Sequence, residues 1–232
     1  MPCLHGERIL AGENPARMER KKSEKHGSNS ADSIVAKKPS ILPPETTLGA
    51  LIDWLKSEGV SGLIIGGVAA SLLARPRFTR DIDALILLEE DLWEKFLDAG
   101  ERFGFAPRID NPAGFAHRSR VFLVRHKPTG IDIDIALAGL PFEKESIKQT
   151  RWRKIGNLSL PLPTPENLII MKAIAHRPQD MEDIRALVGA NPKLDLRRIR
   201  RLVKQFSTAL DAPDILADLE KLLRGTRARR RR

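Results

Sequence analysis

Two short segments of this sequence each carry a pair of aspartates that could do chemistry together. Asp81 and Asp83 open an apolar run, and Asp132 and Asp134 alternate with isoleucines. Because residues i and i+2 of a strand point to the same face, each pair predicts two carboxylates side by side. Such carboxylates repel each other unless a cation lies between them, and Mg²⁺ prefers carboxylate oxygens together with substrate phosphate. The pattern therefore predicts a divalent-metal site that acts on a phosphate substrate.

A glycine pair precedes the first aspartates. Gly66 and Gly67 follow an apolar run at 63–65 and precede a short helical pattern at 68–75. Glycine permits close backbone approach, and a helix N-terminus can direct amide N–H groups at phosphate. A glycine pair or a single Asp-x-Asp is weak evidence, and a merely polar sheet face is the structural alternative. The combination is stronger, because neighbouring aspartate strands would add a third carboxylate and complete a two-metal site for nucleotidyl transfer.

Hydrophobic periodicity predicts the elements that must position these residues. We expect helices and strands in this order: a helix capped by Thr46 or Thr47 and ended by Gly59, a strand at 63–65, a helix at 68–75, a strand at 81–88, a helix at 89–102, a hairpin of strands 119–127 and 131–138, a helix from Glu143, short strands near 152 and 158, and three or four helices after Pro165. This order predicts an α+β fold, in which a mixed β-sheet is flanked by helices and followed by a C-terminal helical subdomain.

Composition divides the chain further. Residues 1–45 are polar and aperiodic, which predicts a disordered leader. We expect a core over residues 46–162, a helical subdomain over 163–223 and an Arg-rich tail over 224–232. The three tryptophans, at positions 54, 93 and 152, are predicted to be core or rim anchors.

The net charge of +10 is concentrated near the C-terminus. Residues 46–196 are balanced, whereas residues 197–232 hold 12 basic and 4 acidic side chains. Such a basic segment attracts polyanions by neutralising phosphates and releasing counterions, so it predicts a nucleic-acid partner. A solvated helix face with a frayed end explains the charge equally well. Phe206 is the segment's one aromatic residue, so base stacking is not expected there.

Several classes of protein are excluded. The single cysteine, Cys3, permits neither an internal disulfide nor a cysteine-rich metal site. No apolar run is long enough to cross a bilayer and no signal peptide is evident, so we expect a soluble, cytoplasmic protein without a membrane partner. The sequence patterns of serine hydrolases, zinc proteases and P-loop proteins are missing.

The motifs together resemble the nucleotidyltransferase (polymerase-beta-like) superfamily, and within it the AbiEii/AbiGii-type toxin nucleotidyltransferases of prokaryotes. The resemblance covers roughly residues 48–190 and rests on these segments: Gly66-Gly67-Val68-Ala69, Arg77-Phe78-Thr79-Arg80-Asp81-Ile82-Asp83, Asp134, Leu140-Pro141-Phe142-Glu143, residues 163–173 and residues 177–184. Many members carry Gly-Ser at the first turn, whereas Gly66-Gly67 is common in the toxin-like branch.

The resemblance implies transfer of a nucleoside monophosphate from an NTP to an acceptor hydroxyl, with Mg²⁺ or Mn²⁺. It implies that Asp81 and Asp83 ligate metal and that Asp134 is the third carboxylate, with Asp132 as the alternative. The remaining residues implied by it share a role in holding the nucleotide or orienting the site: Gly66, Gly67, Arg77, Thr79, Lys172 and Asp180.

Simpler roles exist for some of these residues. Lys172 could be a snorkelling side chain at the edge of an apolar face. Asp180 could stabilise a helix N-terminus, and Arg77 could pair with a neighbouring aspartate.

The expected acceptor is RNA, such as a tRNA end, held by the basic C-terminal segment, with a cognate antitoxin as a further partner. Two alternatives remain: a non-catalytic nucleic-acid-binding or regulatory protein on the same fold, and transfer to a protein or a small molecule.

Overall fold

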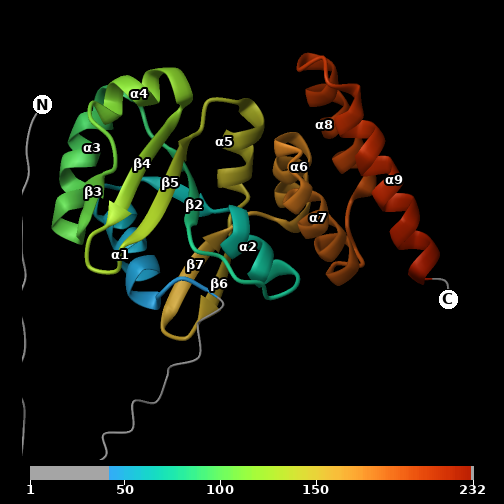
Figure 1. Ribbon diagram of the computed structural model, residues 1–232, viewed down its shortest axis with the longest axis horizontal. Helices are drawn as coiled ribbons and strands as arrows, with labels where there is room; N and C mark the ends of the chain where they lie inside the picture. Colours follow the sequence, from blue (N-terminus) through green and yellow to red (C-terminus); the bar gives the residue numbers. More distant parts are fainter. Residues whose placement is uncertain (1–41, 231–232) are drawn as a thin grey trace, which may run out of the picture. The chain divides into compact units, whose positions relative to one another are not determined.

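A mixed five-stranded β-sheet carries the aspartates (Figure 1), in the strand order β1-β2-β5-β4-β3. Its strands are β1 (Ser61–Ile64), β2 (Ile82–Leu87), β3 (Phe105–Pro107), β4 (Val121–His126) and β5 (Ile131–Leu137). Strands β2 and β5 are parallel, and the other three pairings are antiparallel. A separate antiparallel hairpin consists of β6 (Arg151–Ile155) and β7 (Leu158–Leu162).

The computed structural model describes residues 42–230, with side chains as far as residue 225. Its α-helices are α1 (Glu45–Ser57), α2 (Gly66–Leu73), α3 (Trp93–Gly100), α4 (Pro112–Ser119), α5 (Pro141–Lys148), α6 (Pro165–Ala175), α7 (Pro178–Ala190), α8 (Leu196–Ala209) and α9 (Pro213–Arg230). Two 3₁₀ turns, Glu90–Leu92 and Glu101–Phe103, flank α3. Helices α6 to α9 lie together on one side of the sheet (Figure 1). The α+β fold predicted from the sequence is confirmed.

Alternating side chains give the sheet two different faces. On β2, Ile82, Ala84 and Ile86 are buried in the main hydrophobic core, which also contains Trp54 of α1 and Phe96 of α3. The two rings stack with their centroids 4.3 Å apart, a geometry that adds to the burial of their area. The core therefore fixes which face of β2 points inward.

The opposite face of the sheet carries Asp83 and Asp134. A small apolar cluster containing Leu85 and Ile147 of α5 covers this face beyond the aspartates. Because Asp83 shares its face with Leu85, and Asp134 with Ala136, the register places the carboxylates at the end of that covered region. A one-residue slip would move the isoleucines out of the core, so burial itself holds the carboxylates in position.

Some element boundaries differ from the prediction. Helix α1 begins at Glu45 after Pro44, and Thr47 does not cap it. The Thr47 hydroxyl instead lies 2.8 Å from the Thr129 hydroxyl of the β4–β5 turn. Helix α2 begins at Gly66, two residues earlier than predicted, so the glycine pair forms the helix N-terminus itself.

The sequence prediction missed β3 and α4, and it missed the break of the 89–102 helix into 3₁₀, α and 3₁₀ turns. Strand β3 has three residues and ends in proline, which is too short for alternation to be visible. Helix α4 is capped by Asn111, whose side chain accepts a hydrogen bond from the amide of Gly114 at 2.9 Å.

Helix α9 continues to Arg230, so the described part of the predicted Arg-rich tail is helical. Residues 1–41 of the predicted leader lie outside the part of the chain that the structure describes. The proposed division between residues 162 and 163 stays a prediction; α6 packs on α2, and the main core runs across that boundary. Within residues 42–230, no helix has the length and apolar character needed to cross a membrane.

Candidate active site

The two aspartate strands are neighbours in the sheet. Asp83 of β2 lies opposite Asp134 of β5, and Asp81 immediately precedes β2. Strands paired in parallel present equivalent ends at the same edge, so the three predicted carboxylates come together there.

The glycine pair lies directly against one of these carboxylates. Gly66 has φ +58°, and a Cβ atom added to it would lie 1.7 Å from Oδ2 of Asp83. A side chain at position 66 would therefore have both an unfavourable backbone conformation and a direct overlap with Asp83. The backbone amide of Gly67 donates a hydrogen bond to Asp83. The β1–α2 turn thus holds the Asp83 carboxylate in place.

Asp83 carries the clearest electrostatic strain of the three. Burial raises the pKa of its carboxyl group above the ordinary value of 3.8, and the charges of Asp81 and Asp134 raise it further. The Gly67 amide and the positive charge of Arg177 act in the opposite direction without cancelling the shift. This is the electrostatic signature of a carboxylate cluster that a cation would stabilise.

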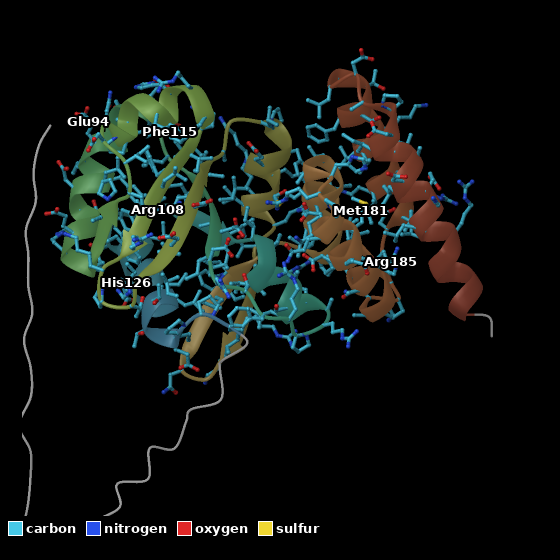
Figure 2. The ribbon with its side chains drawn as sticks, in the orientation of Figure 1. Glu94, Arg108, Phe115, His126, Met181 and Arg185 are labelled. Atoms are coloured by element: carbon cyan, nitrogen blue, oxygen red, sulfur yellow. The ribbon has the colours of Figure 1, made fainter. Side chains whose placement is uncertain are left out.

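Arg108, from the segment after β3, balances part of this negative charge. Its Nη2 donates to Oδ1 of Asp134, and its Nη1 donates to Oδ2 of Asp132 at 3.3 Å. Arg125 of β4 also binds Asp132, with Nε 2.6 Å from Oδ1, and this hydrogen bond lowers the pKa of Asp132. Asp132 is therefore held by two arginines. Asp134 is held by Arg108, which lies over β4 and β5 (Figure 2).

Asp81, Asp132 and Asp134 line a pocket of about 620 Å³, called the aspartate pocket below, whereas Asp83 is not among its lining residues. This volume is in the usual range for small-molecule sites. Arg108 also lines it. Thr79, on the same wall, donates from its hydroxyl to Oδ1 of Asp81 at 3.0 Å. Phe78, which also lines the pocket, is 53% exposed and leaves an aromatic ring open to a ligand.

Lys172 does not lie in the aspartate pocket. It is 4% exposed on α6, and its Nζ lies 2.8 Å from Oδ1 of Asp180 and 2.7 Å from Oδ2 of Asp183. Both of these aspartates belong to α7. The ammonium group is therefore fully engaged within the protein.

Two arginines complete a network around these aspartates. Arg77 donates two hydrogen bonds to the carboxylate of Asp183, of 2.9 and 3.0 Å. Arg177 donates from Nε to Oδ2 of Asp180 at 2.7 Å. Burial alone would raise the pKa of Asp180, but hydrogen bonds from Arg177 and Lys172 outweigh it and hold the pKa below 3.8. We call this set the α6–α7 charge network: Arg77, Lys172, Arg177, Asp180 and Asp183.

Residues 45–221 match the family described as "Nucleotidyl transferase of unknown function (DUF2204)". The match spans the sheet, the aspartates and helices α6 to α8. The chain belongs to this family. No curated protein matches the sequence significantly.

One solved structure shares the fold of this DUF2204 protein, and two others superpose less closely. The antibiotic-resistance factor ANT(2'')-Ia superposes with a TM-score of 0.52 at 15% identity, over 73% of this chain and 94% of that chain. An antigenic nucleotidyltransferase-like protein from Paracoccidioides brasiliensis gives 0.47 at 15% identity, over 75% and 91%. A putative nucleotidyltransferase from Thermotoga maritima gives 0.41 at 17% identity, over 62% and 91%.

The donor chemistry of this DUF2204 site fits a hard divalent cation. Asp81, Asp83 and Asp134 carry oxygen donors of the kind that such a cation prefers, and the burial and neighbouring charges that raise the pKa of Asp83 would favour a cation beside it. Within residues 42–230, no three acidic, histidine or cysteine side chains already stand in a metal-ligating arrangement. Asp134 pairs with Arg108 through its Oδ1 atom.

Sequence reasoning missed two cations of this nucleotidyltransferase, Arg108 and Arg177. Arg108 lies 26 residues before Asp134 in a loop, and no local pattern connects them. Arg177 belongs to one of the motif segments, but the sequence alone assigned it no role. Its hydrogen bond with Asp180 raises its pKa, and the charges of Asp180, Asp83 and Asp81 raise it further. Its side chain is 69% exposed, so unlike Lys172 it can reach a ligand beside the aspartates.

Proposed function

We propose that this DUF2204 protein transfers a nucleoside monophosphate from an NTP to a hydroxyl group of an RNA acceptor. One observation carries the proposal: Asp83 and Asp134 face each other across a parallel strand pair, with Asp81 beside them and Gly66 pressed against Asp83. Family membership supports nucleotidyl transfer as the reaction class.

Each residue of the site has a defined task in this proposal. Asp81, Asp83 and Asp134 would hold Mg²⁺ or Mn²⁺, which would supply charge neutralisation at the phosphates and activation of the attacking hydroxyl. The Gly67 amide holds Asp83, and the other amide groups at the α2 N-terminus would be directed at the nucleotide phosphates. Arg177 contributes an exposed guanidinium beside the aspartates. Arg108 binds Oδ1 of Asp134, which would leave Oδ2 for the metal.

The sequence predicted that Lys172 contacts the triphosphate. In this proposal it instead holds two helices together. Its buried position between Asp180 and Asp183 fixes α7 against α6, and α7 begins next to Arg177. Arg77 joins the loop before β2 to the same network through Asp183. The network therefore positions Arg177 and the first aspartates relative to one another.

RNA is proposed as the acceptor on the basis of charge. Exposed basic side chains on α8 and α9 include Arg197, Arg201, Lys204 and Arg224. Two other arginines of the basic segment are used internally: Arg200 binds Glu220 at 2.6 Å, and Arg198 binds Asn167 at 2.7 Å. A toxin role with a cognate antitoxin remains part of the proposal, and the motif resemblance supports it.

The deciding experiment incubates the protein with each α-labelled NTP, Mg²⁺ and total cellular RNA, beside an Asp81→Ala/Asp83→Ala variant. We expect label in RNA with the intact protein and none with the variant. The NTP that gives this label identifies the nucleotide that is transferred. Label in protein or in a small molecule would overturn the RNA acceptor. No label in any fraction would overturn the transfer reaction.

A further inference from the structure

Strand β6 carries an unusual surface on the outer edge of the β6–β7 hairpin. Its first four side chains are all exposed: Arg151, Trp152, Arg153 and Lys154, named the β6 surface below. Trp152 is 60% exposed, whereas Trp54 and Trp93 are buried at 0% and 1%. The prediction of three core or rim tryptophans is thus correct for two of them, and Trp152 lies on the surface.

The hairpin is anchored through its other strand. Leu160 and Leu162 of β7 are fully buried, and β7 packs on β1 and α1. In the hairpin register Trp152 lies opposite Pro161, and β6 has no neighbour beyond β7 among the described strands. Strand β6 therefore projects away from the core, and its side chains are left for solvent or for a partner.

Protection of the sheet edge explains only half of this surface. Charged residues on an edge strand prevent pairing with other chains, which accounts for the two arginines and the lysine. It does not account for a large exposed indole between them, because exposing that much apolar area costs free energy. Side chains alternate along β6, so Trp152 and Lys154 point to one face and Arg151 and Arg153 to the other. An aromatic ring with a cation beside it, and further cations along the same edge strand, is a combination that can bind an unpaired base and the phosphate backbone together.

The positive charge of the β6 surface is not compensated. Among the described residues, none forms an ion pair with Arg151, Arg153 or Lys154. At the start of β6, Arg151 shares a hollow of about 380 Å³ with Lys148 and Arg198, and Glu166 also lines it. Arg198 is paired with Glu145 and Asn167, so Lys148 is the residue that extends the basic character beyond β6.

The other end of β6 approaches the aspartate pocket. At the hairpin turn, a Cβ atom on Gly156 would lie 2.8 Å from Oε1 of Glu45, so the turn touches the start of α1. The preceding residue, Pro44, lines the aspartate pocket together with Asp81 and Asp134. The turn after β6 thus lies close to the rim of the candidate active site, and the hollow lies at the other end of the strand.

We infer that the β6 surface binds single-stranded RNA, with Arg151, Arg153 and Lys154 at phosphates and Trp152 stacked on a base. The β6 surface then directs the RNA strand toward the aspartate pocket. This inference deepens the proposed function by assigning a binding track to its RNA acceptor. Binding itself requires neither NTP nor metal, so it can be measured separately from transfer.

The test measures binding of fluorescein-labelled U20 RNA by anisotropy in 50–200 mM salt, without NTP. Trp152→Ala should weaken binding by about 5- to 140-fold, the range for loss of one base–aromatic stack. Trp152→Phe should retain most of the affinity because the ring can still stack. U20 should quench the tryptophan fluorescence of the unmodified protein but not that of Trp152→Phe, since the other two tryptophans are buried.

A charge-matched pair of variants tests the basic residues. Arg151→Gln/Arg153→Gln/Lys154→Gln should reduce the slope of log affinity against log salt by up to about 2, or about 0.7 for each phosphate that is no longer neutralised. The control removes three exposed charges elsewhere: Lys95→Gln/Arg118→Gln/Lys127→Gln. An equal reduction in the control would mean that binding follows net charge alone, and it would overturn the inference.

Two further outcomes would overturn it. One is unchanged binding by Trp152→Ala. The other is equal competition by duplex RNA or by polyglutamate, which would indicate a duplex or an acidic protein as the partner. The Asp83→Asn variant separates this inference from the proposed function. If that variant and the unmodified protein both bind U20 but neither transfers label, the binding track stands and the transfer reaction fails.

Discussion

At the scale of single residues, Asp83 combines catalytic suitability with an electrostatic cost. Its carboxylate is buried and faces two other carboxylates, yet it is held by a backbone amide and by Gly66. The folded protein therefore binds a proton at Asp83 more readily than the unfolded chain does. The protonated carboxyl group of Asp83 therefore contributes fully to the free energy of unfolding at pH values below 3.8. This contribution is lost as the pH rises through the raised pKa of the folded state.

Asp83→Asn should consequently separate activity from stability. We expect transfer to fall by about 10²-fold or more, as when a group that stabilises transition-state charge is removed. In chelator at neutral pH, the variant should melt higher than the unmodified protein, by about 2–4 °C for each kcal/mol of repulsion removed. Thermal unfolding followed by circular dichroism gives the second readout. The control is Asp53→Asn, on the exposed side of α1, which should change neither. Retained turnover in Asp83→Asn would refute its assignment as a metal ligand.

Gly66 provides a second residue-scale prediction, because Gly59 offers a matched control. Both glycines have positive φ, +58° and +65°, but an added Cβ at Gly59 meets no atom within 4 Å. Gly59→Ala should therefore cost only the backbone strain, about 1–2 kcal/mol. Gly66→Ala should cost more and should abolish transfer by displacing Asp83. Equal unfolding free energies and activities in the two variants, measured by urea titration and label transfer, would show that the close approach of Gly66 to Asp83 is unimportant.

The position of the candidate carboxylates in the sheet was predictable from the sequence, whereas their role stays a prediction. Alternation of isoleucine and aspartate fixed the face of β5, and the same two-residue period placed Asp81 and Asp83 together. The choice between Asp132 and Asp134 needed the strand register, which puts Asp134 beside Asp83 and Asp132 beside Arg125. Which strands pair depends on contacts distant in sequence, so no local pattern could reveal it.

At the scale of elements, the α6–α7 charge network joins two helices to the loop that carries Arg77. The ammonium group of Lys172 pairs with two aspartates, and each of these aspartates also forms an ion pair with one arginine. Removing one member of a buried ion pair leaves an uncompensated charge, which usually costs about 3–5 kcal/mol. The network therefore contributes to the position of α7 as well as to local charge balance.

Lys172→Met should lower the free energy of unfolding by about 3 kcal/mol, the lower end of that range, because Asp180 keeps Arg177 and Asp183 keeps Arg77. Urea unfolding measures this decrease, with the exposed Lys193→Met as control. The alternative, that Lys172 contacts triphosphate, predicts native stability together with a raised KM for NTP. That combination would contradict the structural role.

Asp180 predicts how the network responds to acid. Its folded-state pKa lies below 3.8, so its carboxylate stabilises the fold at pH values above 3.8, and that contribution disappears as the pH falls through the lowered pKa. Asp180→Asn should therefore be less stable than the unmodified protein at neutral pH, and the difference should shrink in acid. Urea unfolding at pH 7 and at pH 3 measures it. A difference independent of pH would show that packing, not charge, is responsible.

Element prediction succeeded where periodicity was long and failed where an element was short or irregular. The β4–β5 hairpin and the helices after Pro165 have clear patterns, whereas β3 has three residues and α4 starts from a left-handed Asn111. The burial of Lys172 was equally hidden, because α6 is covered by α2, α7 and α8 and leaves no polar stripe to mark its exposed face. Tertiary packing, not local sequence, decides these cases.

At the scale of the whole molecule, positive charge is divided between two places. The basic C-terminal segment was predicted from composition, but Arg198 and Arg200 use their charge inside the protein. The β6 surface was not predicted as a binding surface, because its charges are balanced by acidic residues elsewhere in residues 46–196 and disappear from a net count. Local exposure therefore says more about partners than the charge of a segment does.

Deletion of residues 224–232 tests the C-terminal contribution. It removes six arginines but leaves the buried α9 residues Ile215, Leu219 and Leu223, so the fold should persist. U20 binding should weaken, and the salt slope should fall by about 0.7 for each phosphate that these arginines neutralise. Because the β6 surface is retained, quenching of Trp152 by saturating RNA should survive the deletion. Loss of quenching at saturation would mean that the C-terminal segment, and not β6, determines how the strand lies on the protein, whereas an unchanged slope would show that these arginines bind no phosphate.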